Sequence, residues 1–356
     1  MSNWTEYLAS QGARFHIDEA TQVEDFGRTL TRDELAAGFV APVTDLGLIA
    51  VAGDDAASFL HNQLTNDVEH LGNDEARLAG YCTPKGRLQA TFLMWRDQEA
   101  IYLQLPRAIQ APLQKRLTMF VLRAKAKLRD ATGEEAFAAV LGFGGAKGEA
   151  ALRAQVGELP AAPYGKTGGD QGSVLRLADA FGAPRYLWIT SAATAQAAFP
   201  ALSRELNGEL ALGGNQAWQL AAIHAGVPQV TQPTQEQFVP QMVNLELLGG
   251  VNFKKGCYPG QEIVARSQYL GKLKRRTSLA TVENAAARAG DEVFSTADPD
   301  QPCGMVVNAA PNGLGGADML VEMKLAALGE DVRFGSATGP ALRFLPLPYQ
   351  LDALDI

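Results

Sequence analysis

Residues 252–262 are the part of the chain whose residue types and spacing best suit chemistry, and they read NFKKGCYPGQE. Cys257 follows Lys255 by two positions, and nearby cations favour the thiolate form of a cysteine. Gly256 and Gly260 bracket the thiol, and glycine lets the backbone approach a ligand closely. We therefore predict a reactive thiol at Cys257 with Lys255 as its electrostatic partner. The alternative is a glycine-rich turn with a surface lysine pair and an incidental cysteine.

Three side chains beside the thiol suit the recognition of a flat heterocycle. Gln261 and Glu262 offer an amide and a carboxylate side by side, and such groups match the donor and acceptor edge of a ring. Tyr258 can stack on an aromatic ligand, and packing within the protein is its alternative role. We predict that these three residues bind a ligand.

The segment at residues 255–262 resembles the K-G-C-Y-x-G-Q-E signature of the YgfZ family of folate-binding proteins. These proteins are related to the glycine-cleavage T-protein, an aminomethyltransferase. The resemblance extends to an N-terminal block at residues 51–56, 59–60 and 64–68, to residues 81–87, and to residues 225–228 and 240–245 that lead into the signature. Together the matched blocks cover most of residues 45–275. Residues 252–262 are called the signature segment from here on.

The resemblance implies an α+β, T-protein-like fold. Two α+β lobes with antiparallel sheets are expected within residues 20–275, and their segments can interleave in sequence. A C-terminal antiparallel β-barrel is expected at residues 276–356, and the three parts would surround a central folate-binding cavity. The implied cofactor is tetrahydrofolate or a derivative. The implied function is support of iron–sulfur cluster assembly or repair, with an indirect role in tRNA modification and with iron–sulfur proteins and tRNA as partners.

The resemblance also implies site residues. In the family, the lysine and cysteine of the signature are tied to activity, and they correspond to Lys255 and Cys257. Lys255 can also neutralise the glutamate tail of a folate. The predicted ligand-binding residues lie in or beside the matched blocks, and they are Lys255, Tyr258, Gln261, Glu262, Asn66 and Arg266.

Two places depart from the T-protein pattern, which has an acidic pair in the strand that faces the folate. That strand has Gln89 and Ala90 here, so it offers no carboxylate for the proton transfers of aminomethyl transfer. The arginine and glutamate of a second T-protein motif are Ala222 and His224 here. The sequence therefore favours folate binding over transfer. The alternative is a folate-dependent one-carbon (aminomethyl) transferase that uses Cys257 as its nucleophile.

Basic residues are concentrated in two stretches. Residues 254–276 hold one acidic residue and seven basic ones, which are Lys254, Lys255, Arg266, Lys272, Lys274, Arg275 and Arg276. Such a stretch can bind a polyglutamyl tail or RNA phosphates, or it can be a solvated surface. Residues 122–129 alternate apolar and basic side chains, which predicts an amphipathic strand with a basic face. A third hypothesis is therefore an RNA-binding module.

Length and composition limit the class of protein. The chain has 356 residues, 47% of them hydrophobic and 20% charged, which is typical of a soluble globular protein with two or three domains. A net charge of −8 argues against a protein that coats nucleic acid. Three widely spaced cysteines are typical of a reducing compartment, and four scattered histidines predict no metal site. No secretory signal and no membrane-spanning run is recognisable, so we expect a cytoplasmic protein.

The elements that must position the signature segment follow from hydrophobic periodicity. The predicted strands of the first lobe are residues 45–52, 76–82, 87–95 and 100–105, with helices after residue 55 and over 106–120. The second α+β segment is predicted from strands at 136–141, 173–177 and 185–190 and helices at 192–206 and 215–225. After residue 276, short strand-like runs separated by turns predict the barrel.

Overall fold

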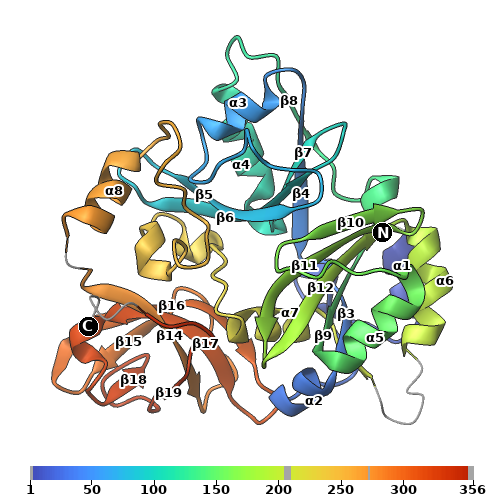
Figure 1. Cartoon of the computed structure of the whole chain (residues 1–356). Coiled ribbons are helices and arrows are strands. Elements are labelled where there is room, and N and C mark those ends of the chain that lie inside the picture. The colour runs from blue at the N-terminus through green and yellow to red at the C-terminus, as the bar shows by residue number, and fades with distance from the viewer. Residues whose placement is uncertain (1–2, 204–209, 272, 352–356) are drawn as a thin grey trace.

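Three large sheets surround a shared centre in the computed structural model, which describes residues 3–203, 210–271 and 273–351 (Figure 1). Each sheet has a hydrophobic core of its own, and a fourth, central core joins them. The predicted α+β class with antiparallel sheets is confirmed. Among the described helices, none is long and apolar enough to cross a membrane.

The first sheet has five antiparallel strands in the order β5-β6-β7-β4-β8. Its strands are β4 (Leu46–Ala52), β5 (Ala76–Cys82), β6 (Leu88–Arg96), β7 (Ile101–Pro106) and β8 (Lys127–Asp130), and its helices are α3 (Ala56–His61) and α4 (Arg107–Met119). Strand β4 is apolar throughout because both of its faces are buried. Ile49 and Val51 pack in the core with α3 and α4, while Leu48 and Ala50 face the central core.

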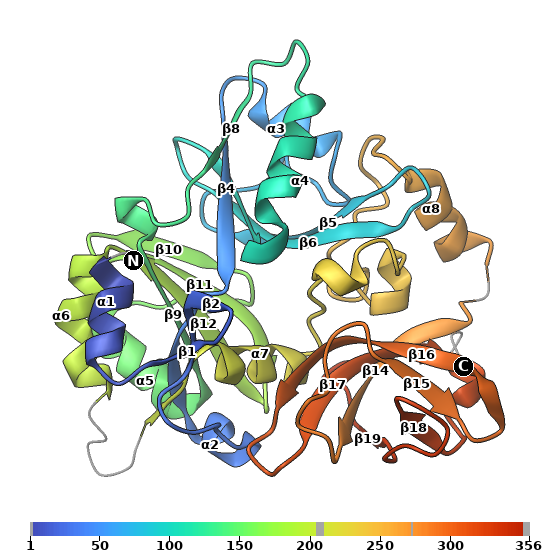
Figure 2. The ribbon, with the colours of Figure 1, turned by 180° about the vertical axis from the view of Figure 1, so that it is seen from behind.

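The second sheet has six strands in the order β10-β11-β12-β9-β3-β13, and only the β3–β13 pair among those described is parallel. Its strands are β3 (Phe39–Pro42), β9 (Ala139–Gly144), β10 (Lys166–Gly169), β11 (Gly172–Ala180), β12 (Ala183–Thr190) and β13 (Ala211–Leu212). Helices α1 (Asn3–Ser10), α5 (Gly145–Val156) and α6 (Ala192–Ser203) cover one face (Figure 2). Strand β3 precedes the first sheet in sequence and the other strands follow it, so the two sheets interleave along the chain.

The third sheet is C-terminal, antiparallel and curled into half a barrel, with the strand order β18-β15-β16-β17-β14-β19 (Figure 1). Its strands are β14 (Arg275–Val282), β15 (Glu292–Ser295), β16 (Asp298–Pro311), β17 (Ala317–Lys324), β18 (Val332–Phe334) and β19 (Arg343–Leu345). Small apolar residues such as Ala280 and Val306 fill its concave side. The curvature brings β16 and β17 beside helix α7 (Asn215–His224).

The remaining elements connect the sheets. They are the hairpin β1 (Arg14–His16) and β2 (Glu19–Asp25), helices α2 (Arg32–Ala37) and α8 (Gln261–Tyr269), and the 3₁₀ turns η1 (Glu135–Phe137), η2 (Gln232–Thr234), η3 (Pro240–Val243) and η4 (Leu325–Ala327). Helix α2 begins with a capping box in which Thr31 and Glu34 bond each other's backbone N–H groups. Helix α8 begins inside the signature segment.

Two sequence predictions need comment. The strand predicted at residues 122–129 is wrong over its first half, because β8 begins only at Lys127. Leu122 has a φ of 47°, and Ala124 N–H donates to the carbonyl of Val121 at 2.8 Å, so this part is a turn. The helix predicted at residues 192–206 is confirmed through Ser203, and residues 204–206 lie outside the described residues.

Candidate functional site

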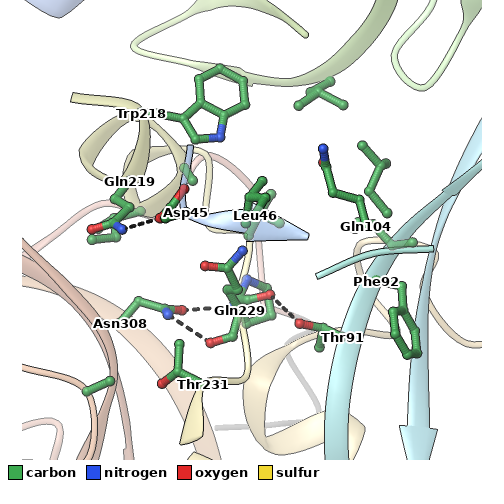
Figure 3. Close-up of a pocket in the computed structure, with 18 of the residues that line it drawn as sticks. Asp45, Leu46, Thr91, Phe92, Gln104, Trp218, Gln219, Gln229, Thr231 and Asn308 are labelled. Carbon is green, nitrogen blue, oxygen red and sulfur yellow. Dashed lines mark hydrogen bonds between the residues drawn. The ribbon is translucent and has the colours of Figure 1, made fainter. Parts of the chain in front are cut away.

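A cavity of about 290 Å³ lies where the three sheets and α7 meet (Figure 3). Its lining residues come from every layer of the fold and include Asp45, Leu46, Leu78, Thr91, Phe92, Leu93, Gln104, Tyr164, Leu177, Arg185, Trp218, Gln219, Ala222, Ile223, Val227, Pro228, Gln229, Thr231, Ala287, Arg288, Ala289, Asn308 and Ala309. Most of these side chains are apolar, and a few polar groups are spaced among them. A largely apolar cavity with a few polar groups is typical of a small-molecule site.

Trp218 on α7 forms an aromatic wall of this central cavity (Figure 3), whereas the ring of Phe92 on β6 packs in the core of the first sheet. The guanidinium carbon of Arg185 lies 4.9 Å from the centre of the Trp218 ring. Arg185 is 2% exposed, its Nε donates to the carbonyl of Ala178 at 3.0 Å, and its Nη1 has no partner among the described residues. Burial lowers the pKa of Arg185 to about 10, so the cavity wall holds a guanidinium cation at neutral pH.

Asp45 supplies a carboxyl group at the start of β4. The side-chain amide of Gln219 donates to Asp45 Oδ2 at 2.6 Å, and Oδ1 has no partner among the described residues (Figure 3). Burial raises the pKa of Asp45 to about 6, although the Gln219 hydrogen bond acts in the opposite direction. Asp45 therefore changes its protonation state closer to neutral pH than an exposed carboxyl group does.

The segment at residues 227–231 closes another side of the cavity and is held from both flanks. Asn308 on β16 accepts from Gln229 N–H and donates to the Gln229 carbonyl, both at 2.8 Å (Figure 3). Thr91 on β6 donates to the carbonyl of Pro228 at 3.3 Å and accepts from Val230 N–H at 3.1 Å. The cavity wall thus depends on contacts from the first and third sheets together.

The signature segment lies outside this cavity, beside the hairpin that joins β5 and β6. Gly260 has a φ of 82°, and a Cβ atom on it would stand 2.7 Å from the Cα of Gly86. At its other end, Asn252 N–H donates to the carbonyl of Thr65 at 2.9 Å. None of the predicted site residues is among the residues that line the central cavity in the part of the chain that the structure describes.

Lys255, Cys257 and Tyr258 are brought together by the turn of the signature segment. The Nζ atom of Lys255 lies 4.7 Å from the centre of the Tyr258 ring and donates to the carbonyl of Gly256 at 3.1 Å. Cys257 is exposed, whereas Tyr258 is buried and serves to pack the segment. Burial lowers the pKa of Lys255 to about 8, although the charges of Asp67, Cys257 and Glu69 act to raise it.

The other predicted ligand-binding residues divide into two groups. The side-chain amide of Asn66 donates to the carbonyls of Leu78 and Gly249, both at 2.7 Å, so it fastens the loop that precedes the signature segment. Gln261, Glu262 and Arg266 lie on α8, where Glu262 and Arg266 are exposed. These three side chains have no hydrogen-bond partner among the described residues, so they are free to contact a ligand or partner.

Gln89 stands where the T-protein pattern has a carboxylate, and a loop brings a carboxylate to it. The amide of Gln89 donates to Glu236 Oε1 at 2.9 Å. Glu236 has a φ of 62°, which is unusual for a residue other than glycine, and its N–H donates to the carbonyl of Leu88 at 2.7 Å. The strand itself offers no carboxylate, as expected, but the loop residue Glu236 brings one beside Gln89, and Glu236 does not line the central cavity.

The stretch at residues 254–276 exposes fewer positive charges than its sequence suggests. Arg275 bonds Glu322 through Nη2 and Oε2 at 2.9 Å, and the buried Arg276 forms an ion pair with Glu246. Lys272 lies outside the described residues. Three exposed cations (Lys254, Arg266 and Lys274) and the half-buried Lys255 are left on this surface.

Sequence reasoning missed the residues of the central cavity, chiefly Asp45, Trp218, Gln229 and Asn308. The signal available for Asp45 was a carboxylate immediately before an apolar strand. Of the two positions noted as departures on α7, Ala222 lines the cavity, whereas His224 does not. His224 Nε2 instead bonds Asp318 Oδ2 at 2.6 Å.

No protein-family model matches the chain. The chain is 30% identical over 312 residues to the tRNA-modifying protein YgfZ of Escherichia coli (strain SMS-3-5 / SECEC), which covers 86% of this chain and 92% of that protein. It is 33% identical over 231 residues to the tRNA-modifying protein YgfZ of Shigella sonnei (strain Ss046), which covers 65% of this chain and 68% of that one.

A solved structure has the same fold. The glycine cleavage system aminomethyltransferase T from Bartonella henselae superposes with a TM-score of 0.73 over 96% of both chains, at 15% sequence identity. At this identity the likeness concerns the fold alone. The predicted T-protein-like fold is confirmed.

Proposed function

Because this chain belongs to the YgfZ family, we propose that it is a tetrahydrofolate-binding protein that supports tRNA modification by maintaining iron–sulfur enzymes. The single observation that carries the proposal is the central cavity, which combines the aromatic wall of Trp218 with spaced amide and carboxyl groups. The names of the relatives supply the link to tRNA modification. The proposed role in maintaining iron–sulfur enzymes comes from the resemblance of the signature segment to the K-G-C-Y-x-G-Q-E signature of the YgfZ family.

The chemistry of the cavity suits a reduced pterin. A pterin ring is flat, and its edge carries an amino group, a ring N–H and a carbonyl oxygen. Trp218 offers a face for stacking, while Gln104 and Asp45 offer hydrogen-bonding groups along the wall. We propose that the pterin occupies this space and that Arg185 faces its carbonyl oxygen.

The signature segment carries a second role in this proposal. Cys257 is an exposed thiol, and Lys255 beside it is a half-buried cation. We propose that Cys257 acts as a reactive thiol for iron–sulfur clients and that Lys255 stabilises its thiolate. The free α8 side chains of Gln261, Glu262 and Arg266 then face the client or the distal end of a folate.

Calorimetric titration with tetrahydrofolate tests the cavity. Wild type is expected to bind saturably, and Trp218→Leu to bind about 10-fold more weakly because it loses the stacking face. Lys255→Ala, which lies outside the cavity, is the matched control and is expected to match wild type with the monoglutamate. If Lys255→Ala weakens the binding of polyglutamylated tetrahydrofolate but not of the monoglutamate, the glutamate tail reaches the signature segment. An absence of saturable binding would overturn the proposal.

Cell-based complementation tests the role of the signature segment. In cells that lack the chromosomal copy, Cys257→Ala and Lys255→Ala are expected to leave iron–sulfur tRNA-modifying enzymes underactive, whereas Lys254→Ala is expected to restore them. Full activity with both signature variants would contradict the roles proposed for Cys257 and Lys255.

One observation favours a second candidate, the folate-dependent aminomethyl transferase. Glu236 brings a carboxylate to the Gln89 position, and a carboxylate there is what proton transfer requires. Purified protein would then form methylenetetrahydrofolate from an aminomethyl donor, and Glu236→Gln would lower that rate. No turnover above the uncatalysed reaction would dismiss this candidate.

A further inference from the structure

Arg288 lies where the central cavity meets solvent. Of the described residues that line the cavity, Arg288 is the one that is exposed, whereas Trp218 is 6% exposed and Arg185 is 2% exposed. No described residue forms an ion pair or a side-chain hydrogen bond with Arg288. A largely apolar cavity therefore has an unpaired, solvated guanidinium on its outer wall.

The loop that carries Arg288 is fixed by its backbone. The N–H of Gly290 donates to the carbonyl of Val306, and the N–H of Val306 donates to the carbonyl of Asp291, both at 2.8 Å. The carboxylate of Asp291 accepts from the backbone N–H of Arg288 at 2.8 Å. A Cβ atom on Gly290 would stand 2.9 Å from the Cβ of Pro233, so the loop also packs against η2. The base of the Arg288 side chain is thus held in place while its guanidinium stays free to bind.

Beside Arg288, the cavity is lined by small apolar side chains. Ala287 and Ala289 flank Arg288 in sequence, and both line the cavity together with Ala309. The cavity volume of about 290 Å³ lies at the lower end of the roughly 300–1,000 Å³ typical of small-molecule sites. This space suits a ring system with an apolar linker, so the anionic tail of a folate has to continue outside the cavity.

The other charged groups near the cavity are poorly placed for an anionic tail. Arg185 is enclosed, with its guanidinium carbon 4.9 Å from the centre of the Trp218 ring. Asp45 is a carboxyl group and would repel a carboxylate when it is ionised. Lys255 lies outside the cavity among the described residues. Arg288 is the cation that both lines the cavity and reaches solvent.

We propose that Arg288 binds the glutamate tail of a tetrahydrofolate whose ring occupies the central cavity, and that this chain therefore prefers polyglutamylated folates. A guanidinium can donate two parallel N–H hydrogen bonds to one carboxylate, and further glutamates add negative charge beside it. This inference rests on the proposed function. It specifies where the tail leaves the cavity and which class of folate is bound most tightly.

Calorimetric titration of the full-length protein tests the inference with three probes. They are 6-methyltetrahydropterin, which has no tail, tetrahydrofolate, and tetrahydrofolate triglutamate. Wild type is expected to bind the triglutamate more tightly than the monoglutamate. Arg288→Gln is expected to weaken the triglutamate about fivefold and to leave the pterin without a tail unchanged, because only the tail loses its cation. Arg288→Lys keeps the charge and is expected to restore part of the affinity.

Two variants control for a general effect of charge. Arg343 is an exposed arginine on β19 of the same sheet, and it does not line the cavity in the described part of the chain. Arg343→Gln is expected to match wild type with all three probes, and so is Lys255→Ala. A loss of triglutamate affinity in Lys255→Ala but not in Arg288→Gln would overturn the inference. So would an equal loss for all three probes in Arg288→Gln, which a structural role of Arg288 predicts.

Failure of this inference is distinguishable from failure of the proposed function. If wild type binds none of the three probes, the folate site and the tail contact fall together. If wild type binds tetrahydrofolate saturably and Arg288→Gln binds the triglutamate equally well, only the role of Arg288 is overturned and the cavity proposal stands. Thermal unfolding of each variant establishes that the compared proteins are folded.

Discussion

Gly260 and Gly86 pack backbone against backbone, since a Cβ atom on Gly260 would stand 2.7 Å from both the N and the Cα atoms of Gly86. This contact docks the signature segment on the β5–β6 hairpin. It explains why two glycines far apart in sequence are both required, one at a φ of 82° and the other at 71°.

Gly260→Ala is therefore expected to destabilise the fold by about 2–4 kcal/mol, because strain at positive φ adds to a backbone clash. Gly249→Ala is the matched control, since Gly249 has a φ of 74° and nothing within 4 Å of its Cβ position. It should cost about 1 kcal/mol, from strain alone. Urea denaturation measures both values, and equal costs would mean that the contact with Gly86 adjusts freely.

Lys255→Met should stabilise the protein at pH 7 and lose that effect toward pH 10.5. Burial lowers the pKa of Lys255 to about 8 in the folded state, so the unfolded chain binds more protons between that pH and its own value near 10.4. Stability then rises with pH through this window in wild type. Because the side chain is half-exposed, we expect a gain below about 1 kcal/mol. Lys254→Met, at an exposed neighbour, should change little.

Asp45 also makes the stability of the fold depend on pH, with the opposite sign to Lys255. Because burial raises its folded-state pKa to about 6, the stability it contributes is complete below about pH 4 and is lost as pH rises through 6. Asp45→Asn should therefore gain up to about 2 kcal/mol at pH 7.5 and almost nothing at pH 4. Denaturant titrations at the two pH values test this, with the exposed Asp54→Asn as control. A constant difference at both values would argue against a titrating Asp45.

The ion pair of Arg276 and Glu246 is expected to matter more than any surface pair. Their side chains are 2% and 4% exposed, so Arg276→Met would remove a buried guanidinium from a buried carboxylate and cost about 3–5 kcal/mol. Arg333 pairs with Asp331 at the surface, and Arg333→Met should cost less than about 1 kcal/mol. Thermal and urea unfolding measure the stability of both variants. Similar losses of unfolding free energy would show that burial does not decide how much the Arg276–Glu246 pair contributes.

Local sequence alone identified the signature segment and determined much of the secondary structure. The apolar run before residue 53 forms β4, the capping box at Thr31 and Glu34 starts α2, and strand β5 has the predicted bounds. These features depend on neighbours within a few residues, so hydrophobic periodicity and residue spacing predict them directly. The prediction failed from Leu122 to Ala126, where a left-handed backbone at Leu122 and a turn replace the start of an alternating pattern that on its own predicts a strand.

Only the tertiary structure decided where the sites lie. Asp45, Trp218 and Asn308 come from three separate parts of the chain, and they share one cavity because three sheets pack around α7. The same packing separates Cys257 from that cavity and brings His61 to its neighbour Gly256. A sequence pattern fixes which side of its own element a residue faces. Distances between elements depend on how their buried faces fit together, and no local spacing encodes them.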